Sequence, residues 1–223
     1  MSAIEAVVFD LDGTLIDSVP DVAAAVNRLL AEDGRRTFAI KELKPMIGRG
    51  AGDMLEKAFR LTGAPLEESG IPAAVARYLE HYLRHPAEGT VVFPGGREIL
   101  ARFAADGLPL GICTNKPRAA TASVLKALGL EAFFRGVSCD DAPARKPDGR
   151  HVRHTLELMA AAELRAALVG DSEIDMAAAR DAGVAAIAVS WGYPNDASKP
   201  LDADVTIDRF SDLPAALETV ARP

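Results

Sequence analysis

Short apolar runs alternate with stretches of helical periodicity along most of this chain, and this alternation limits the possible folds more than any other feature. Four runs have the length and composition of strands that are buried on both faces. They cover residues 6–9, 108–113, 166–169 and 185–189, and weaker runs lie near Val137 and Val205. Helical spacing occupies residues 96–105, 118–128, 152–162 and 174–182. The pattern predicts an α/β fold with a doubly wound, parallel sheet.

One long segment lacks the alternation. Between residues 17 and 87 there is no strand pattern, and helical spacing recurs three times, at residues 22–30, 53–61 and 73–83. The segment begins just after the first predicted strand, and the sheet pattern resumes near residues 91–96. We therefore expect residues 17–87 to form a second, smaller α-helical cap domain. It would act as a lid on a core domain made of residues 1–16 and 88–223.

Composition excludes some classes of partner. The 223 residues carry a formal net charge of −7 with no long Lys/Arg run. Non-specific binding to nucleic acid or to an anionic membrane needs concentrated positive charge, so we expect neither as a partner. There is no leader pattern and no run of roughly 20 apolar residues that would span a membrane. We expect a cytoplasmic monomer or homodimer that acts on a small molecule. Cys113 and Cys139 should be buried, reduced thiols.

Polar residues follow three of the predicted strands where each one ends. Asp10 comes directly after the first strand, and Thr114 and Asn115 follow the second. The third strand is followed by Gly170 and then by Asp171. The carboxyl ends of parallel strands lie along one edge of a sheet, which is where ligands bind in this class of fold. These side chains should therefore converge on one site.

Asp10 and Asp12 are the most informative of the polar residues. Side chains two positions apart in an extended segment point the same way, so both carboxylates should face one site. Gly13 permits a tight turn whose N–H groups can hold an anion. Two carboxylates would repel that anion unless a cation lay between them, and Mg²⁺ prefers oxygen ligands and bridges carboxylate to phosphate. The pattern predicts a combined magnesium and phosphate site.

Four motifs resemble those of the haloacid dehalogenase superfamily of phosphotransferases. DLDGTLIDS at residues 10–18 is similar to its first motif, and CTNKP at 113–117 to its second. Lys146-Pro147 and GDSEID at 170–175 are similar to the third and fourth. The order and approximate spacing agree over almost the whole chain, which implies a Rossmann-like core. Where the family often has a further proline, this chain has Gly149, a change that concerns only the start of the next helix.

The resemblance implies a role for each matching residue in phosphoryl transfer. Asp10 would be the nucleophile that forms an aspartyl-phosphate, and Asp12 the general acid and base. Mg²⁺ would be held by the Asp10 carboxylate, the Asp12 backbone carbonyl and Asp171. The phosphate would be bound by the Gly13 turn, Thr114, the backbone around Asn115, and Lys146, which adds a fixed positive charge. Asp175 would orient metal-bound waters or Lys146 from outside the ligand shell.

Substrate choice should depend on the cap, because a closing lid brings its residues over the leaving group. IGRGAGD at residues 47–53 is a glycine-flanked loop at the start of a helix, and it carries Arg49. A guanidinium on such a loop suits a carboxylate or a second anionic group of a small substrate.

Two longer stretches, residues 107–117 and 191–214, are similar to bacterial phosphoglycolate phosphatases. That resemblance implies Mg²⁺-dependent hydrolysis of 2-phosphoglycolate, a small phosphorylated metabolite, to glycolate and phosphate. The alternatives are another small-molecule phosphatase, acting on a sugar phosphate, a nucleotide or pyrophosphate, and a phosphosugar mutase of the β-phosphoglucomutase kind. An inactive binding module on the same fold is a remote alternative, since Asp10, Asp12, Lys146 and Asp171 are all present.

Overall fold

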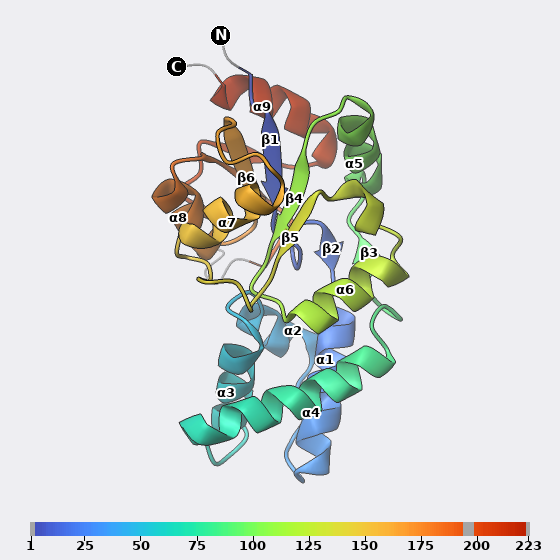
Figure 1. The fold of residues 1–223 in the computed structure, drawn as a ribbon. Helices are drawn as coiled ribbons and strands as arrows, with labels where there is room; N and C mark the ends of the chain where they lie inside the picture. Colours follow the sequence, from blue (N-terminus) through green and yellow to red (C-terminus); the bar gives the residue numbers. More distant parts are fainter. Residues whose placement is uncertain (1–2, 194–198, 222–223) are drawn as a thin grey trace.

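A computed structural model describes residues 3–193 and 199–221, and its core is a six-stranded parallel sheet (Figure 1). The strand order is β5 (Gly136–Ser138), β4 (Leu110–Cys113), β1 (Ala6–Phe9), β6 (Ala166–Gly170), β7 (Ala185–Val189) and β8 (Val205–Ile207). The doubly wound, parallel sheet that the sequence predicts is confirmed. The first strand lies in the middle, between β4 and β6, so the chain winds outward from β1 in both directions.

Helices cover both faces of the sheet. In β1, Val7 and Phe9 pack into the cluster that includes α5 (Gly96–Ala105), α6 (Arg118–Ala127) and α9 (Leu213–Val220). Ala6 and Val8 pack into the opposite cluster, with α7 (Arg150–Leu158) and α8 (Glu173–Ala182). Because both faces are covered, the four central strands β4, β1, β6 and β7 carry no polar side chain at any position.

The register of the strands brings their carboxyl ends into line. Phe9, the last residue of β1, is opposite Ile112 of β4 on one side and Val169 of β6 on the other. The backbone N–H of Asp10 still donates to the carbonyl of Val169, at 2.9 Å. The polar residues that follow β1, β4 and β6 therefore leave the sheet at the same edge.

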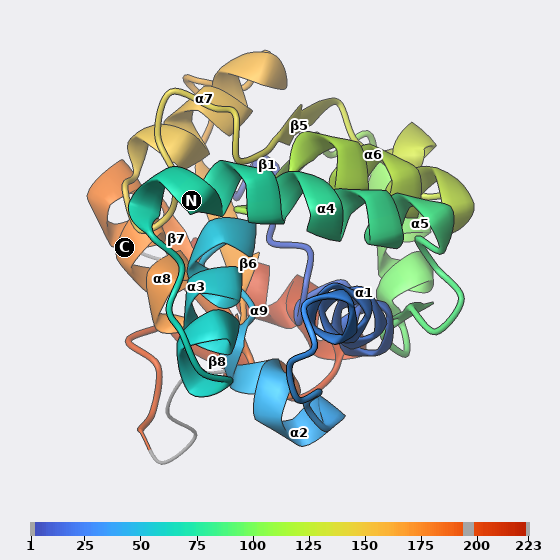
Figure 2. The ribbon, with the colours of Figure 1, turned by 90° about the horizontal axis from the view of Figure 1, so that it is seen from below.

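The helical insert lies beyond this edge and has its own core. It comprises α1 (Val19–Glu32), α2 (Ile40–Leu43), α3 (Ala51–Leu61) and α4 (Ile71–Arg84), with 3-10 turns at Lys44–Met46 and Glu68–Gly70. Viewed from the side of the insert, α4 runs beside α6 of the core (Figure 2). The three predicted helices are confirmed, each a little longer than its pattern, while the short α2 was not predicted. Further 3-10 turns lie in the core at Glu131–Phe133 and Phe210–Asp212.

The chain crosses between core and insert through a small antiparallel ladder that the sequence did not reveal. In it β2 (Ile16–Asp17) pairs with β3 (Val91–Val92). The expectation that the sheet resumes near residues 91–96 was wrong in one respect, because Val91 and Val92 pair with β2 and not with the parallel sheet. Two-residue strands are too short to produce a periodic signal.

Two simpler expectations were tested by the structure. Cys113 and Cys139 are both buried and unbridged, as predicted. Among the described residues, no helix has the length and apolar character needed to cross a membrane.

Candidate active site at the carboxyl edge of the sheet

The loops at the carboxyl edge bring the predicted site residues together. Asp10 follows β1, Thr114 and Asn115 follow β4, Lys146 lies in the loop after β5, and Asp171 follows β6. All five side chains belong to buried residues. The convergence that strand ends alone predicted is therefore present in the structure.

Lys146 lies between two carboxylates. Its Nζ is 2.6 Å from Oδ1 of Asp10 and 2.6 Å from Oδ1 of Asp175. Burial raises the pKa of Asp10 to about 7, and the Lys146 ammonium opposes that rise. Burial acts to lower the pKa of Lys146, but the carboxylates of Asp10 and Asp175 outweigh it and raise that pKa. The lysine is therefore a fixed cation, held against the aspartate that was predicted to be the nucleophile.

Asp10, Asp171 and Asp175 form a buried acidic triad that is able to hold a metal ion. One carboxylate oxygen from each lies within 4.8 Å of the others. Burial, followed by repulsion from Asp175 and Asp10, raises the pKa of Asp171 well above its usual range. These oxygens are hard ligands of the kind that Mg²⁺ and Ca²⁺ prefer. A cation at this point would offset the repulsion.

The surrounding residues fix the carboxylates of the triad. Asp171 accepts hydrogen bonds from Thr14 Oγ1 at 2.9 Å and from the backbone N–H of Tyr193 at 2.6 Å. Asp175 Oδ2 accepts from the backbone N–H of Ser172 at 3.0 Å and from its hydroxyl at 2.5 Å. Asp175 Oδ1 is also 2.6 Å from Lys146 Nζ, and the predicted role of Asp175 in orienting that lysine or metal-bound waters stays a prediction. The predicted metal ligation by the Asp12 carbonyl stays a prediction.

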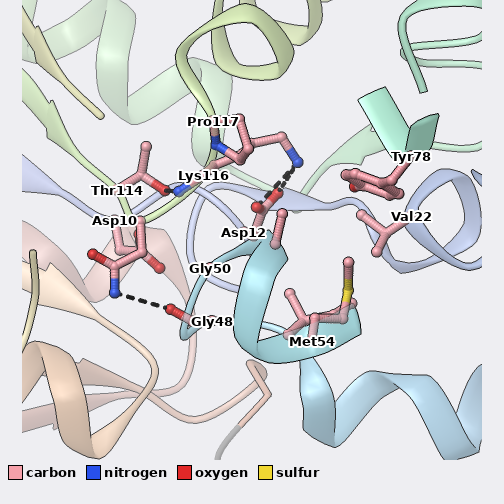
Figure 3. A pocket seen from close by; sticks show the side chains of 13 residues that line it. Asp10, Asp12, Val22, Gly48, Gly50, Met54, Tyr78, Thr114, Lys116 and Pro117 are labelled. Carbon is pink, nitrogen blue, oxygen red and sulfur yellow. Dashed lines mark hydrogen bonds and ion pairs between the residues drawn. The ribbon is translucent and has the colours of Figure 1, made fainter. Parts of the chain in front are cut away.

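Asp12 lines the same cavity as Asp10, as their spacing predicted. Its two carboxylate oxygens accept hydrogen bonds from Lys116 Nζ at 3.0 and 3.1 Å (Figure 3). Oδ1 of Asp12 also accepts a hydrogen bond from the Ser18 hydroxyl, at 2.6 Å. The two aspartates therefore have different partners, with Asp10 on Lys146 and Asp12 on Lys116. Different surroundings are what allow two neighbouring carboxylates to take different chemical roles.

Gly13 has a left-handed backbone, with φ of +90°. A Cβ at this position would collide with the carboxylate of Asp171 and with the ring of Tyr193. The Gly13 N–H donates to the carbonyl of Ile16, at 2.9 Å, within the turn. The structure therefore accounts for this glycine through its close approach to Asp171, while its part in phosphate binding stays a prediction.

Asn115 connects three segments of the site. Its Nδ2 donates to the Lys146 carbonyl at 3.0 Å, and its Oδ1 accepts from the Lys146 N–H at 3.0 Å. The same Nδ2 lies 3.3 Å from the carbonyl of Gly48 in the insert. Thr114 is equally buried, and its hydroxyl accepts from the backbone N–H of Lys116 at 3.2 Å. Asn115 thus fixes the backbone that carries Lys146.

The cavity lies between the sheet edge and the insert. Its lining from the insert is mostly apolar and comprises Val22, Ile47, Gly48, Gly50, Ala51, Met54 and Tyr78. From the core it takes Asp10, Asp12, Thr114, Asn115, Lys116 and Pro117. Arg49 is exposed and is not among these residues, although Gly48 and Gly50 on either side of it are. The predicted contact of Arg49 with the substrate stays a prediction.

Lys116 and Tyr193 are site residues to which the sequence reasoning gave no role. Lys116 directly follows Thr114 and Asn115 at the end of β4, so the rule that singled out those two residues also points to it. Tyr193 gave no such signal. Its N–H binds Asp171 and its hydroxyl lies 2.6 Å from Oδ1 of Asp17, and both contacts join distant parts of the chain.

Comparison with known proteins identifies relatives that match most of the chain. A family model described as haloacid dehalogenase-like hydrolase matches residues 7–189. The phosphoglycolate phosphatase of Caulobacter vibrioides is 40% identical over 215 residues, which cover 96% of this chain and 91% of that protein. The phosphoglycolate phosphatase of Rhodospirillum rubrum is 37% identical over 214 residues, which cover 94% of this chain and 89% of that protein.

A solved structure is similar over the same extent. It is that of a predicted phosphoglycolate phosphatase from Haemophilus somnus 129pt, with a TM-score of 0.86 and 26% sequence identity. The match covers 97% of this chain and 99% of the other. The core and the helical insert are therefore both shared with that protein.

Proposed function

Because this chain belongs to the family of haloacid dehalogenase-like hydrolases, we propose that it is a Mg²⁺-dependent phosphoric monoester hydrolase that converts 2-phosphoglycolate to glycolate and phosphate. One observation supports the reaction class above all, namely that Lys146 holds Asp10, a member of the acidic triad, at the carboxyl end of β1. The substrate is inferred from the phosphoglycolate phosphatases that are 40% and 37% identical to this chain.

The triad fits a magnesium ion. The site holds four buried carboxyl groups and two buried ammonium groups, which belong to Asp10, Asp12, Asp171, Asp175, Lys116 and Lys146. A divalent cation would balance the difference. When bound by Asp10 and Asp171, Mg²⁺ would neutralise charge on the phosphoryl oxygens and keep them close to the carboxylates.

In this proposal Asp10 acts as the nucleophile. One of its oxygens is held by Lys146 at 2.6 Å, which fixes the carboxylate and leaves the other oxygen for attack on phosphorus. The new bond joins that oxygen to phosphorus, while the bond between phosphorus and the ester oxygen breaks. The product is an aspartyl-phosphate on Asp10, which water can cleave.

Asp12 is placed to move the protons. Its carboxyl group gives a proton to the departing ester oxygen, which leaves as the hydroxyl of glycolate. Asp12 then takes a proton from a water molecule, and the resulting hydroxide attacks phosphorus and breaks its bond to Asp10. Phosphate leaves and Asp10 is regenerated. Ser18 and Lys116 keep the Asp12 carboxyl in one orientation during these steps.

The insert would limit the size of the substrate and exclude water. Its apolar side chains Val22, Met54 and Tyr78 line the cavity opposite Asp10 and Asp12 (Figure 3). A small ester with few carbons beyond the phosphate suits a cavity with this lining. Closure over such a substrate would keep bulk water from the aspartyl-phosphate until the leaving group has departed.

The test is a panel of kcat/KM values measured with Mg²⁺. It includes 2-phosphoglycolate, pyrophosphate, β-glucose 1-phosphate, other sugar phosphates and nucleotides, and the Asp10→Asn variant serves as the blank. We expect 2-phosphoglycolate to lead by about tenfold or more, which corresponds to roughly 1.4 kcal/mol of transition-state binding. A higher kcat/KM for another ester would identify that ester as the substrate and would leave the proposed reaction class unchanged. A requirement for a sugar bisphosphate would instead identify a mutase.

A further inference from the structure

Lys116 reaches into the cavity at the point where the leaving group of a substrate would lie. Its Nζ is 3.0 Å from Oδ1 and 3.1 Å from Oδ2 of Asp12, so one ammonium group spans both carboxylate oxygens. Its side chain is only 4% exposed. The aromatic ring of Tyr82, in α4 of the insert, lies 4.6 Å from the same Nζ. The ammonium is thus enclosed between the core and the insert.

Among the residues that the structure describes, no other cationic side chain lines the cavity. Lys146 is not among the lining residues, and its ammonium is already shared by Asp10 and Asp175 at 2.6 Å each. Asp10 and Asp12 both lie in the lining, so an anionic substrate meets two acidic side chains there. Within the described lining, Lys116 is therefore the cation that can bind a second negative group of the substrate, apart from its phosphate.

The distances place that negative group close to the ester oxygen. A general acid lies about 3 Å from the oxygen that receives its proton, so the ester oxygen is next to Asp12 and therefore near Lys116. When a carboxylate is attached to the first carbon of the leaving group, its oxygens are about 3 Å from the ester oxygen by bond lengths alone. A carboxylate at that carbon therefore falls within reach of the Lys116 ammonium.

We propose that Lys116 binds the substrate through a carboxylate on the carbon next to the ester oxygen, and that this contact selects such esters over neutral ones. This inference rests on the proposed function, because it takes Asp10 and Asp12 as the groups that face phosphorus and the ester oxygen. It assigns the selection of the carboxylate to a residue of the core. Val22 and Met54 of the insert offer no polar group to a second anion, and Tyr78 offers only an uncharged hydroxyl.

The experiment compares two substrates of nearly equal size. 2-Phosphoglycolate carries the carboxylate, and 2-hydroxyethyl phosphate has a neutral CH₂OH group in its place. The quantity measured is the ratio of their kcat/KM values, in the wild-type protein and in Lys116→Gln. We expect the substitution to lower this ratio by roughly 10- to 100-fold, the range for a buried hydrogen bond to a charged group. Lys116→Arg keeps a cation and should retain most of the preference.

Two matched variants serve as controls. Lys126→Gln removes an exposed lysine of α6, and the ratio should not change. Arg49→Ala tests the rival assignment, in which the cation of the insert loop binds the carboxylate of the substrate. If Arg49→Ala lowers the ratio and Lys116→Gln does not, the proposal is overturned in favour of Arg49.

If Lys116 acts only by orienting Asp12 and does not bind the substrate, the result is different. In that case Lys116→Gln would slow both substrates by the same factor and leave the ratio unchanged, which overturns the proposal. A wild-type ratio close to 1 would also overturn it.

Binding provides a readout that does not depend on turnover. Dissociation constants of the two esters are measured by calorimetry on Asp10→Asn and on Asp10→Asn with Lys116→Gln. The proposal requires the second substitution to weaken binding of 2-phosphoglycolate selectively, and equal weakening of both esters overturns it. If the wild-type protein turns over neither ester above the blank, the proposed function fails, while the calorimetric ratio still decides the role of Lys116.

Discussion

The carboxylate of Asp21 accepts two hydrogen bonds from Thr90. This contact joins the segment where the chain enters the helical insert to the segment where it returns to the core. Oδ2 of Asp21, in the first turn of α1, accepts hydrogen bonds from the Thr90 N–H at 2.8 Å and from its hydroxyl at 2.5 Å. The N–H of Gly89 donates to the same carboxylate, at 2.9 Å from Oδ1. Both residues of the pair are buried.

Replacing Asp21 should destabilise the protein. Asp21→Ala leaves the N–H groups of half-buried Gly89 and buried Thr90 without this acceptor, so we expect the free energy of unfolding to fall by about 2–3 kcal/mol. Urea denaturation measures this change. The control is Asp106→Ala, whose side chain is 65% exposed and 3.9 Å from Arg102. An equal loss in both variants would show that the Asp21 contact adds no stability of its own.

Asp12→Asn should slow turnover of 2-phosphoglycolate by on the order of 10²-fold or more, because the departing alkoxide loses its proton donor. The loss should be smaller with p-nitrophenyl phosphate, whose phenolate leaves without a proton. Steady-state kcat/KM values for the two esters provide the comparison, because they report the steps up to departure of the leaving group and not the hydrolysis of the aspartyl-phosphate that both esters share. Ser18→Ala removes one hydrogen bond to Asp12 and keeps the carboxyl group, so its effect should be smaller. Equal losses on both esters in Asp12→Asn would contradict the role as acid.

Chelation with EDTA should abolish activity and Mg²⁺ should restore it. Since a ligand that binds only the folded state stabilises it, Mg²⁺ at a hundred times its dissociation constant should add about 2.7 kcal/mol. Thermal unfolding with and without Mg²⁺ measures this gain. Asp171→Asn should lose the response, while Asp202→Asn, at an acid that is 89% exposed, should keep it. Full activity in the chelator would rule out the magnesium site.

His151 should make the folded state sensitive to acid. Its side chain is fully buried, and the backbone N–H of Lys146 donates to its Nδ1, at 3.3 Å. Burial, together with the charge of Lys146, lowers the pKa of His151 from 6.5 to about 4. Between these two values the unfolded chain binds a proton that the folded protein does not, so stability falls as the pH falls from 6.5 towards 4.

The comparison for His151 uses the variant His151→Gln. The wild-type protein should lose up to about 3 kcal/mol more than the variant between pH 6.5 and pH 4. Urea denaturation at a series of pH values measures the difference, and other titrating groups cancel because they are present in both proteins. Parallel curves for the two proteins would show that His151 titrates normally.

The sequence was informative wherever the physical cause was local. Four apolar runs predicted four of the strands, because a strand buried on both faces needs apolar side chains at each position. The parallel arrangement then placed Asp10, Thr114 and Asp171 at one edge, since the carboxyl ends of the strands share that edge. The insert was visible because its helices repeat at 3.6 residues while the core alternates between two kinds of element.

The sequence was less informative about the strands that join the two parts. The ladder of β2 and β3 has two residues in each strand, which is too short for periodicity. Asp21 and Thr90 lie 69 positions apart, and no local pattern pairs them. Both pairings depend on the path by which the chain returns from the insert to the core.

Sequence by itself determined the sheet, the helical insert and the set of carboxylates and lysines at the strand ends. Only the tertiary structure decided how these charges are paired, with Lys146 between Asp10 and Asp175, Lys116 on Asp12, and Tyr193 between Asp171 and Asp17. The reason is physical. Apolar periodicity reports the burial of a segment, but ion pairs and hydrogen bonds between distant segments depend on the paths of the loops, which only the packed fold defines.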